Sequence, residues 1–94
     1  ELIDLRTIRP LDMDTILNSV KKTNRLVILE ESWPFGNIST EITYQVQSQA
    51  FDYLDAPVQK INTADTPAPY SPVLLQEWLP NHEDVMRAVK KVMN

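Results

Sequence analysis

The chain has 94 residues, a formal net charge of −4 and no cysteine. This length allows one domain or part of one, and so short a chain buries roughly 60–65% of the surface that its unfolded form exposes. The acidic balance disfavours nucleic acid as a partner, because phosphate binding needs a concentrated basic patch. The lack of cysteine excludes a disulfide scaffold, thiolate catalysis and a zinc ribbon. No apolar run approaches the length of a membrane span, so we expect no membrane partner.

The first third of the chain predicts a strand, a helix and a second strand. Residues 2–5 suggest a short strand, and because the chain opens directly in it, we expect a missing N-terminal portion. Asp12 is the expected N-cap of a helix that ends near Asn24, where asparagine can adopt the left-handed conformation. Residues 25–31 place four consecutive aliphatic side chains between charged ends, typical of a parallel strand buried on both faces. This order predicts a right-handed βαβ crossover.

The remainder predicts two further long helices around a third strand. A loop over residues 32–37 precedes a helix with apolar side chains at every fourth position as far as Leu54. Residues 58–61 can form a short strand. The proline-rich residues 62–80 predict little regular structure beyond one helical turn at 74–78. Asn81 is the expected cap of the last helix. Alternating strands and helices predict an α/β layered fold in one domain, residues 1–94, without an internal boundary.

Few residues offer chemistry. Glu30 and Glu31 follow the central strand, and ligands of open parallel sheets bind outside the carboxyl ends of strands. The alternative, which we favour, is that these acids solvate the strand end and lie near the next helix N-terminus. A single glycine excludes Rossmann and P-loop phosphate sites. His82, the only histidine, is expected on the surface in the first turn of the last helix, and we predict no catalytic or metal-binding residue.

Four aromatic side chains fall in or beside the predicted loops: Trp33, Phe35, Tyr70 and Trp78. Aromatic residues in loops often fill local gaps in the core, and they are also enriched as interface anchors. The sequence leaves both interpretations open at about equal weight. We therefore treat these four residues as candidate partner-binding residues.

Several segments resemble, in order and over essentially the whole chain, the C-terminal domain of transketolase-like, thiamine-diphosphate enzymes. They include IDLRTIRPLD at residues 3–12, SVKKTNR at 19–25, AFDYLDAP at 50–57, ADTPAPY at 64–70 and LPN at 79–81. Within this family the segments are similar to beta subunits of the decarboxylating component of 2-oxo acid dehydrogenases. The proline-rich segment favours the pyruvate enzyme over the branched-chain one, which remains the alternative.

The resemblance implies a three-layer α/β/α sandwich with a mainly parallel sheet, lacking the family's first strand and helix. It also implies a pyruvate dehydrogenase in which an alpha subunit and a second beta subunit complete a heterotetramer, located in the bacterial cytoplasm or the mitochondrial matrix. Thiamine diphosphate and magnesium would bind in regions outside this chain, so no cofactor residue is assigned. The segment itself is expected to be non-catalytic.

The resemblance further implies docking to the subunit-binding domain of the dihydrolipoyl acetyltransferase core. Asp55 and, if the natural chain ends there, Asn94 correspond to the positions that receive a basic residue in relatives. Asp55 also follows a predicted helix C-terminus, where the helix dipole disfavours an acid, and a cationic partner would relieve this. A local cap or turn role for Asp55 is equally open.

A separate hypothesis, independent of the resemblance, is that the chain is a small-ligand regulatory domain. Its ligand would bind at Glu30, Glu31 and the Trp33 loop.

Overall fold

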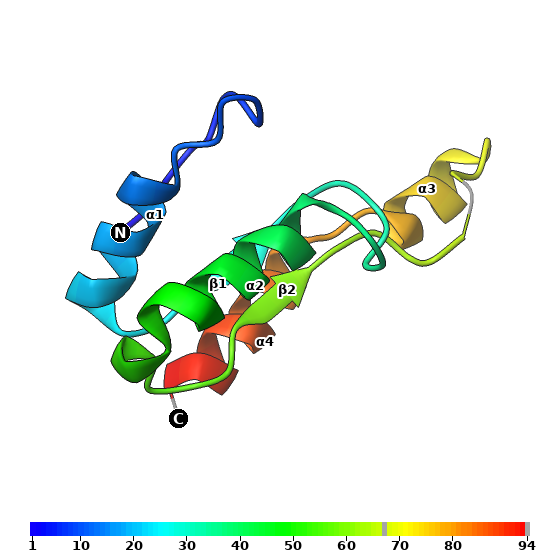
Figure 1. Cartoon of the computed structure of the whole chain (residues 1–94). Coiled ribbons are helices and arrows are strands. Elements are labelled where there is room, and N and C mark those ends of the chain that lie inside the picture. Colours follow the sequence, from blue (N-terminus) through cyan, green and yellow to red (C-terminus); the bar gives the residue numbers. More distant parts are fainter. Residues whose placement is uncertain (67, 94) are drawn as a thin grey trace.

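The computed structural model of the chain describes residues 1–66 and 68–93. Along the chain its elements are α1 (Met13–Thr23), β1 (Val27–Leu29), α2 (Ile38–Ala50), the 3₁₀ turn η1 (Phe51–Tyr53), β2 (Gln59–Ile61), α3 (Pro72–Trp78) and α4 (His82–Met93) (Figure 1). None of the helices in this described part is both long enough and apolar enough to cross a bilayer.

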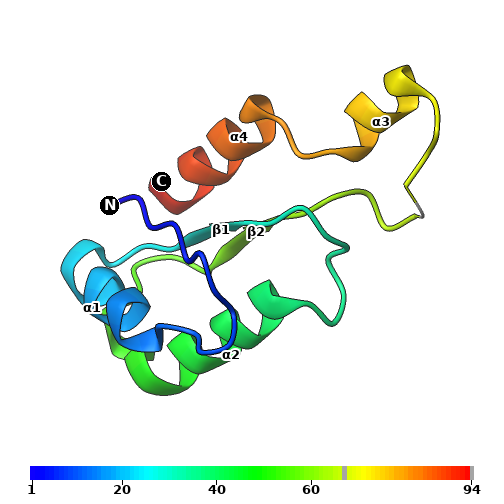
Figure 2. The ribbon, with the colours of Figure 1, turned by 90° about the horizontal axis from the view of Figure 1, so that it is seen from above.

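The two strands pair in parallel, with Val27 opposite Gln59 and Leu29 opposite Ile61. Helix α2 connects them, so β1, α2 and β2 form a βαβ unit, whereas the crossover expected over residues 2–31 is wrong because residues 2–5 form no strand. In Figure 2, α1 and α2 lie on one side of the strands and α4 lies on the other. The predicted α/β architecture, with helices on both faces of a parallel sheet, is therefore confirmed.

The larger part of the core lies between α1, α2 and the sheet. Six buried side chains form it, contributed by the helical faces that the apolar spacing predicts: Ile16, Leu17, Val20, Ile42, Val46 and Ala50. On the other side of the sheet, Ile61 of β2 and the buried Ala88 and Val92 of α4 supply a smaller apolar contact. The spacing rule succeeds here because three to four residues separate successive side chains on one helical face.

The expected strand over residues 2–5 is wrong. This segment has no regular structure, and Leu2 is 99% exposed. No neighbouring strand lies beside it in the described residues, so its backbone groups lack the ladder that would hold them extended. Arg6, at φ 60°, turns the chain away instead.

The expected complete burial of β1 is also wrong in part. Val27 and Ile28 are half-buried, whereas Leu29 is 58% exposed. Four aliphatic residues in a row predict burial on both faces, but a sheet with only two described strands leaves β1 with an open edge.

Helix ends follow the predicted caps in most places. Asp12 accepts a hydrogen bond from the Thr15 backbone N–H (3.1 Å), and Asn24 takes the left-handed conformation at φ 66°. Helix α2 ends at Ala50 rather than at Leu54. The 3₁₀ turn that follows redirects the chain, so that the Asp55 N–H donates to the Asn24 carbonyl (2.8 Å).

Candidate functional site

Glu30 directly follows β1, and its carboxylate is hydrogen-bonded to other residues of the chain. Its carboxylate accepts hydrogen bonds from the Ser39 backbone N–H (3.3 Å), the Ser39 hydroxyl (2.5 Å) and the Asn62 amide (2.6 Å). Ser39 lies in the first turn of α2, so Glu30 serves as a distant cap and places negative charge at the positive helix end. The geometry favours the interpretation of Glu30 as a structural acid over that of a ligand-binding one.

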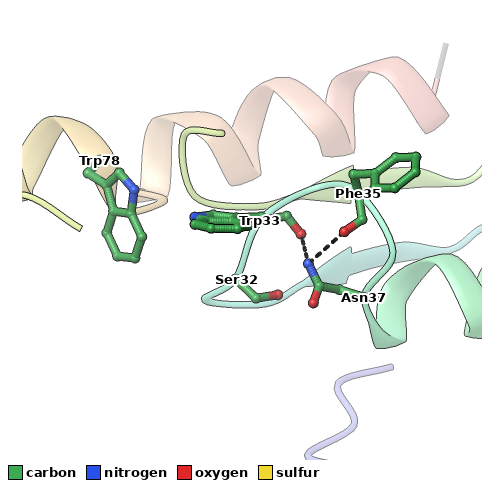
Figure 3. Close-up of a pocket in the computed structure, with 5 residues that line it drawn as sticks. All are labelled: Ser32, Trp33, Phe35, Asn37 and Trp78. Atoms are coloured by element: carbon green, nitrogen blue, oxygen red, sulfur yellow. Dashed lines mark hydrogen bonds between the residues drawn. The ribbon is translucent and has the colours of Figure 1, made fainter. Parts of the chain in front are cut away.

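Asn37 is one of two residues, with Ser39, whose type and position suit a cap of α2, and it has a different role. It precedes α2 but makes no side-chain bond to that helix. Its amide instead donates to the backbone carbonyls of Trp33 and Phe35, as Figure 3 shows. Asn37 therefore holds the loop after β1 closed, while Glu30 takes over the capping function.

The loop after β1 and the end of α3 meet at a small cavity of about 230 Å³. Its lining consists of Ser32, Trp33, Phe35, Asn37 and Trp78 (Figure 3). The indole N–H groups of Trp33 and Trp78 both donate to the Thr66 carbonyl, at 2.8 and 2.7 Å. This shared acceptor ties the proline-rich segment to the loop after β1.

The four aromatic candidates do not form one surface. Trp33, Phe35 and Trp78 line the cavity, whereas Tyr70 does not line it and is fully exposed. Phe35 is 88% exposed, so its ring fills no gap in the core. The gap-filling interpretation thus fails for Phe35 and Tyr70, and it holds in part for the hydrogen-bonded tryptophans.

Asp55 lies at a junction of three segments. Its backbone is bonded to Asn24, and its carboxylate Oδ2 lies 3.8 Å from Nη2 of Arg25. The same guanidinium donates through Nε to the carbonyl of Val92 in the last turn of α4 (2.8 Å). Arg25 therefore links the loop of Asp55 to the C-terminal turn of α4. Asn94, the second predicted partner residue, lies outside the described residues.

The carboxylate of Asp55 keeps room for a further donor. It is 55% exposed, and the 3.8 Å separation from Arg25 is longer than a hydrogen bond. The final carbonyls of α4 carry the negative end of the helix dipole. The Asp55 carboxylate and these carbonyls together form a small acceptor-rich spot, with Arg25 beside Asp55 and Lys90 and Lys91 in the same last turn of α4.

Sequence reasoning missed Arg25, which it treated only as a charged strand boundary. Sixty-seven positions separate Arg25 from Val92, so no local pattern could connect them. The sequence does hold one indication: Arg25 lies directly between a helix cap and an apolar strand. A cation in that position is partly buried and therefore needs hydrogen-bond acceptors nearby.

The remaining residue types that could bind a metal ion or transfer a proton are histidine and the acids. His82 is exposed in the first turn of α4, as expected. Across residues 1–66 and 68–93, no group of three or more histidine or acidic side chains is arranged to hold a metal ion.

Comparison with known proteins identifies the fold family. The family described as "Transketolase, C-terminal domain" matches residues 1–85. The chain is 54% identical over 92 residues to the pyruvate dehydrogenase E1 component subunit beta of Rickettsia felis, covering 98% of this chain and 28% of that protein. The mitochondrial counterparts of Dictyostelium discoideum and Saccharomyces cerevisiae are 47% and 45% identical, over 98% and 100% of this chain and 26% of each relative.

These relatives are all longer than the chain, which spans about a quarter of their length. The match to the family covers most of the chain and agrees with helices packed on both faces of a parallel sheet. The chain belongs to the transketolase C-terminal domain family.

Proposed function

We propose that the chain is the C-terminal assembly domain of a pyruvate dehydrogenase beta subunit. Identity of 45–54% to proteins of that name, sustained over at least 98% of the chain, supports this assignment over the branched-chain alternative. The relatives include bacterial and mitochondrial proteins, so the proposed location is the bacterial cytoplasm or the mitochondrial matrix. The catalysed reaction belongs to the whole enzyme, to which this domain contributes structure.

The proposed partners are an alpha subunit, a second beta subunit and the subunit-binding domain of the dihydrolipoyl acetyltransferase core. The observation that carries the last of these is the position of Asp55. Its exposed carboxylate lies beside the C-terminal turn of α4, to which Arg25 links it. An acceptor-rich spot of this kind suits a lysine or arginine side chain, because complementary charges fix the register of an interface.

Thiamine diphosphate and magnesium are proposed to bind elsewhere in the whole enzyme. The acid that topology would offer, Glu30, already accepts three hydrogen bonds from Ser39 and Asn62. Glu30 therefore does not fit the role of a ligand for a magnesium diphosphate. We assign no step of the reaction to this chain.

The docking proposal is tested with Asp55→Ala in the whole gene product that carries this chain, assembled with its alpha subunit. We expect affinity for the isolated subunit-binding domain to fall by roughly tenfold or more, with a weaker dependence on salt. Decarboxylation of pyruvate with an artificial electron acceptor should be unchanged, because the substituted acid lies outside any catalytic role proposed here.

The matched control is Asp52→Ala. Asp52 is an exposed acid in η1, three positions before Asp55, so its substitution removes the same charge. Unchanged affinity in Asp55→Ala, or an equal loss in both variants, would refute docking at Asp55. An equal loss would instead indicate a general effect of net charge.

A second candidate function is a regulatory site for a small ligand, favoured by one observation. Ser32 lines the cavity between Trp33 and Trp78, and its buried hydroxyl has no hydrogen-bond partner among the described residues. A flat ligand with one polar edge would satisfy that hydroxyl and stack on an indole. A rise in melting temperature with ATP that is lost in Trp33→Ala would support this function. No rise would reject ATP as its ligand.

A further inference from the structure

Arg25 occupies a position in which one side chain bridges two parts of the proposed docking site. Its Nε donates to the Val92 carbonyl at 2.8 Å, and Nη2 lies 3.8 Å from the Asp55 carboxylate. The side chain is about one third exposed, so the bridge is partly shielded from solvent. The planar guanidinium presents several donors in a fixed fork, which allows it to serve two acceptors at once.

The neighbouring backbone strengthens this arrangement. Arg25 directly follows Asn24, whose carbonyl accepts the Asp55 N–H at 2.8 Å. The loop that carries Asp55 is thus attached to the 24–25 segment by a backbone bond and a charge contact. The last turn of α4 is attached to the same segment by the guanidinium.

We infer that Arg25 is the positioning residue of the docking site, holding the Asp55 carboxylate and the last turn of α4 in one arrangement that receives a partner's lysine or arginine side chain. The inference rests on the proposed docking at Asp55. Because Nε is fixed on Val92, the guanidinium stays beside Asp55 without closing to hydrogen-bond distance. The carboxylate keeps accepting capacity, and the partner's cation meets acceptors that are already in place.

Simple electrostatics predicts the opposite effect for the same residue. Removing a cation next to this acceptor-rich spot should strengthen the attraction of a cationic partner and raise the association rate. Positioning predicts that affinity falls when the cation is removed, because Asp55 and α4 lose their common anchor. The sign of the change therefore distinguishes the two roles.

The test is a double-mutant cycle in the whole gene product, assembled with its alpha subunit. Arg25→Gln, Asp55→Ala and the double variant are compared by calorimetric titration with the isolated subunit-binding domain. We expect Arg25→Gln alone to weaken binding by roughly five- to tenfold, and to have less than about a twofold effect when Asp55 is already alanine. Arg25→Lys should give an intermediate loss of affinity. The compact lysine ammonium keeps the charge but lacks the planar fork that serves the Val92 carbonyl and the Asp55 carboxylate together.

Lys22→Gln is the matched control. It removes one exposed cation from the end of α1, where Lys22 pairs with Glu1, so net charge changes equally without touching Asp55. Circular dichroism and the melting temperature of each variant verify the fold. If Arg25→Gln does not fold, the cycle is run with Arg25→Lys, which keeps the charge.

Each outcome decides one question. Unchanged or tighter binding in Arg25→Gln would overturn the positioning role, and so would an equal loss in the Asp55→Ala background, which would indicate a general structural role. No loss in Asp55→Ala itself would refute the docking site rather than the role of Arg25. A loss that disappears in the Asp55→Ala background would support both.

Discussion

Replacing Glu30 with alanine should destabilise the chain, although the residue lies at the carboxyl end of a parallel strand, where ligands of such sheets can bind. The carboxylate accepts hydrogen bonds from the backbone and hydroxyl of Ser39 and from the amide of Asn62. Ser39 is fully buried, so its hydroxyl cannot turn to water after the substitution. The change therefore leaves a buried donor without an acceptor.

The magnitude follows from the three donors. An unpaired buried hydroxyl costs about 1–3 kcal/mol. Losing the acceptor and the negative charge at the start of α2 costs roughly a further 0.5–1 kcal/mol. Asn62 is half-buried and can recover part of its bond from water, so its contribution is small. We expect Glu30→Ala to lower the free energy of unfolding by about 3 kcal/mol.

Glu30→Gln should cost about half as much, because the amide oxygen still accepts one hydrogen bond while the charge at the helix end is lost. The double variant Glu30→Ala with Ser39→Ala should cost less than the sum of the single changes, since no buried hydroxyl is then left unpaired. Glu31→Ala is the matched control, an exposed acid one position along, and should change stability by less than about 0.5 kcal/mol.

The measurement is urea unfolding followed by both tryptophan fluorescence and far-ultraviolet circular dichroism. Trp33 and Trp78 report on the loops near Glu30, and the dichroism signal reports on the helices, so coincident transitions support a two-state analysis. Equal stability of the Glu30→Ala and Glu31→Ala variants would refute the capping role. A ligand site at the strand end would then become the better account of Glu30.

Two further predictions concern the helices. Hydrogen bonds from the hydroxyl and the backbone N–H of Thr15 lower the pKa of Asp12. Its stabilising effect should therefore be complete above the ordinary aspartate pKa of about 3.9 and be lost as the pH falls through the lower value in the folded chain. Serine can cap the helix without titrating. In Asp12→Ser the free energy of unfolding should therefore fall less steeply as the pH is lowered, and an unchanged pH dependence would contradict this. Val46→Ala should lower the free energy of unfolding by about 2–3 kcal/mol in urea, because Val46 is fully buried. Val89→Ala at an exposed site of α4 should change it little, and equal losses would contradict the assigned core.

The helices could be predicted from the sequence because their signals are local. Asp12 and Asn24 lie at the two ends of α1, and each cap bond spans three or four residues. The turn predicted at 74–78 is part of α3, which begins two positions earlier at Pro72, where the missing N–H of proline costs nothing. The apolar stripes of α1 and α2 identify most of the core, since one helical face needs only sequence spacing.

Strands were harder to predict because their partners are distant. Val27 and Gln59 are adjacent in the sheet but 32 positions apart, and nothing in residues 2–5 reveals whether a neighbour exists. The same limit applies to side-chain networks. Asn62 and Glu30 lie 32 positions apart, and Arg25 and Val92 lie 67 apart. Residue type could suggest that these groups need partners, but only the fold determines which partners they meet.

Glu30 and Asp55 differ in what each carboxylate still has to offer. The carboxyl-end rule for parallel sheets points to Glu30, yet three donors from its own chain occupy that acid. Asp55 lies near the amino ends of the strands, away from their carboxyl ends, is 55% exposed and has the Arg25 guanidinium at 3.8 Å. An acid whose acceptors are filled internally stabilises the fold, whereas an exposed and pre-positioned acid gains most from an external cation. The physical basis for the proposal that a partner docks at Asp55 is thus the unused accepting capacity of its carboxylate.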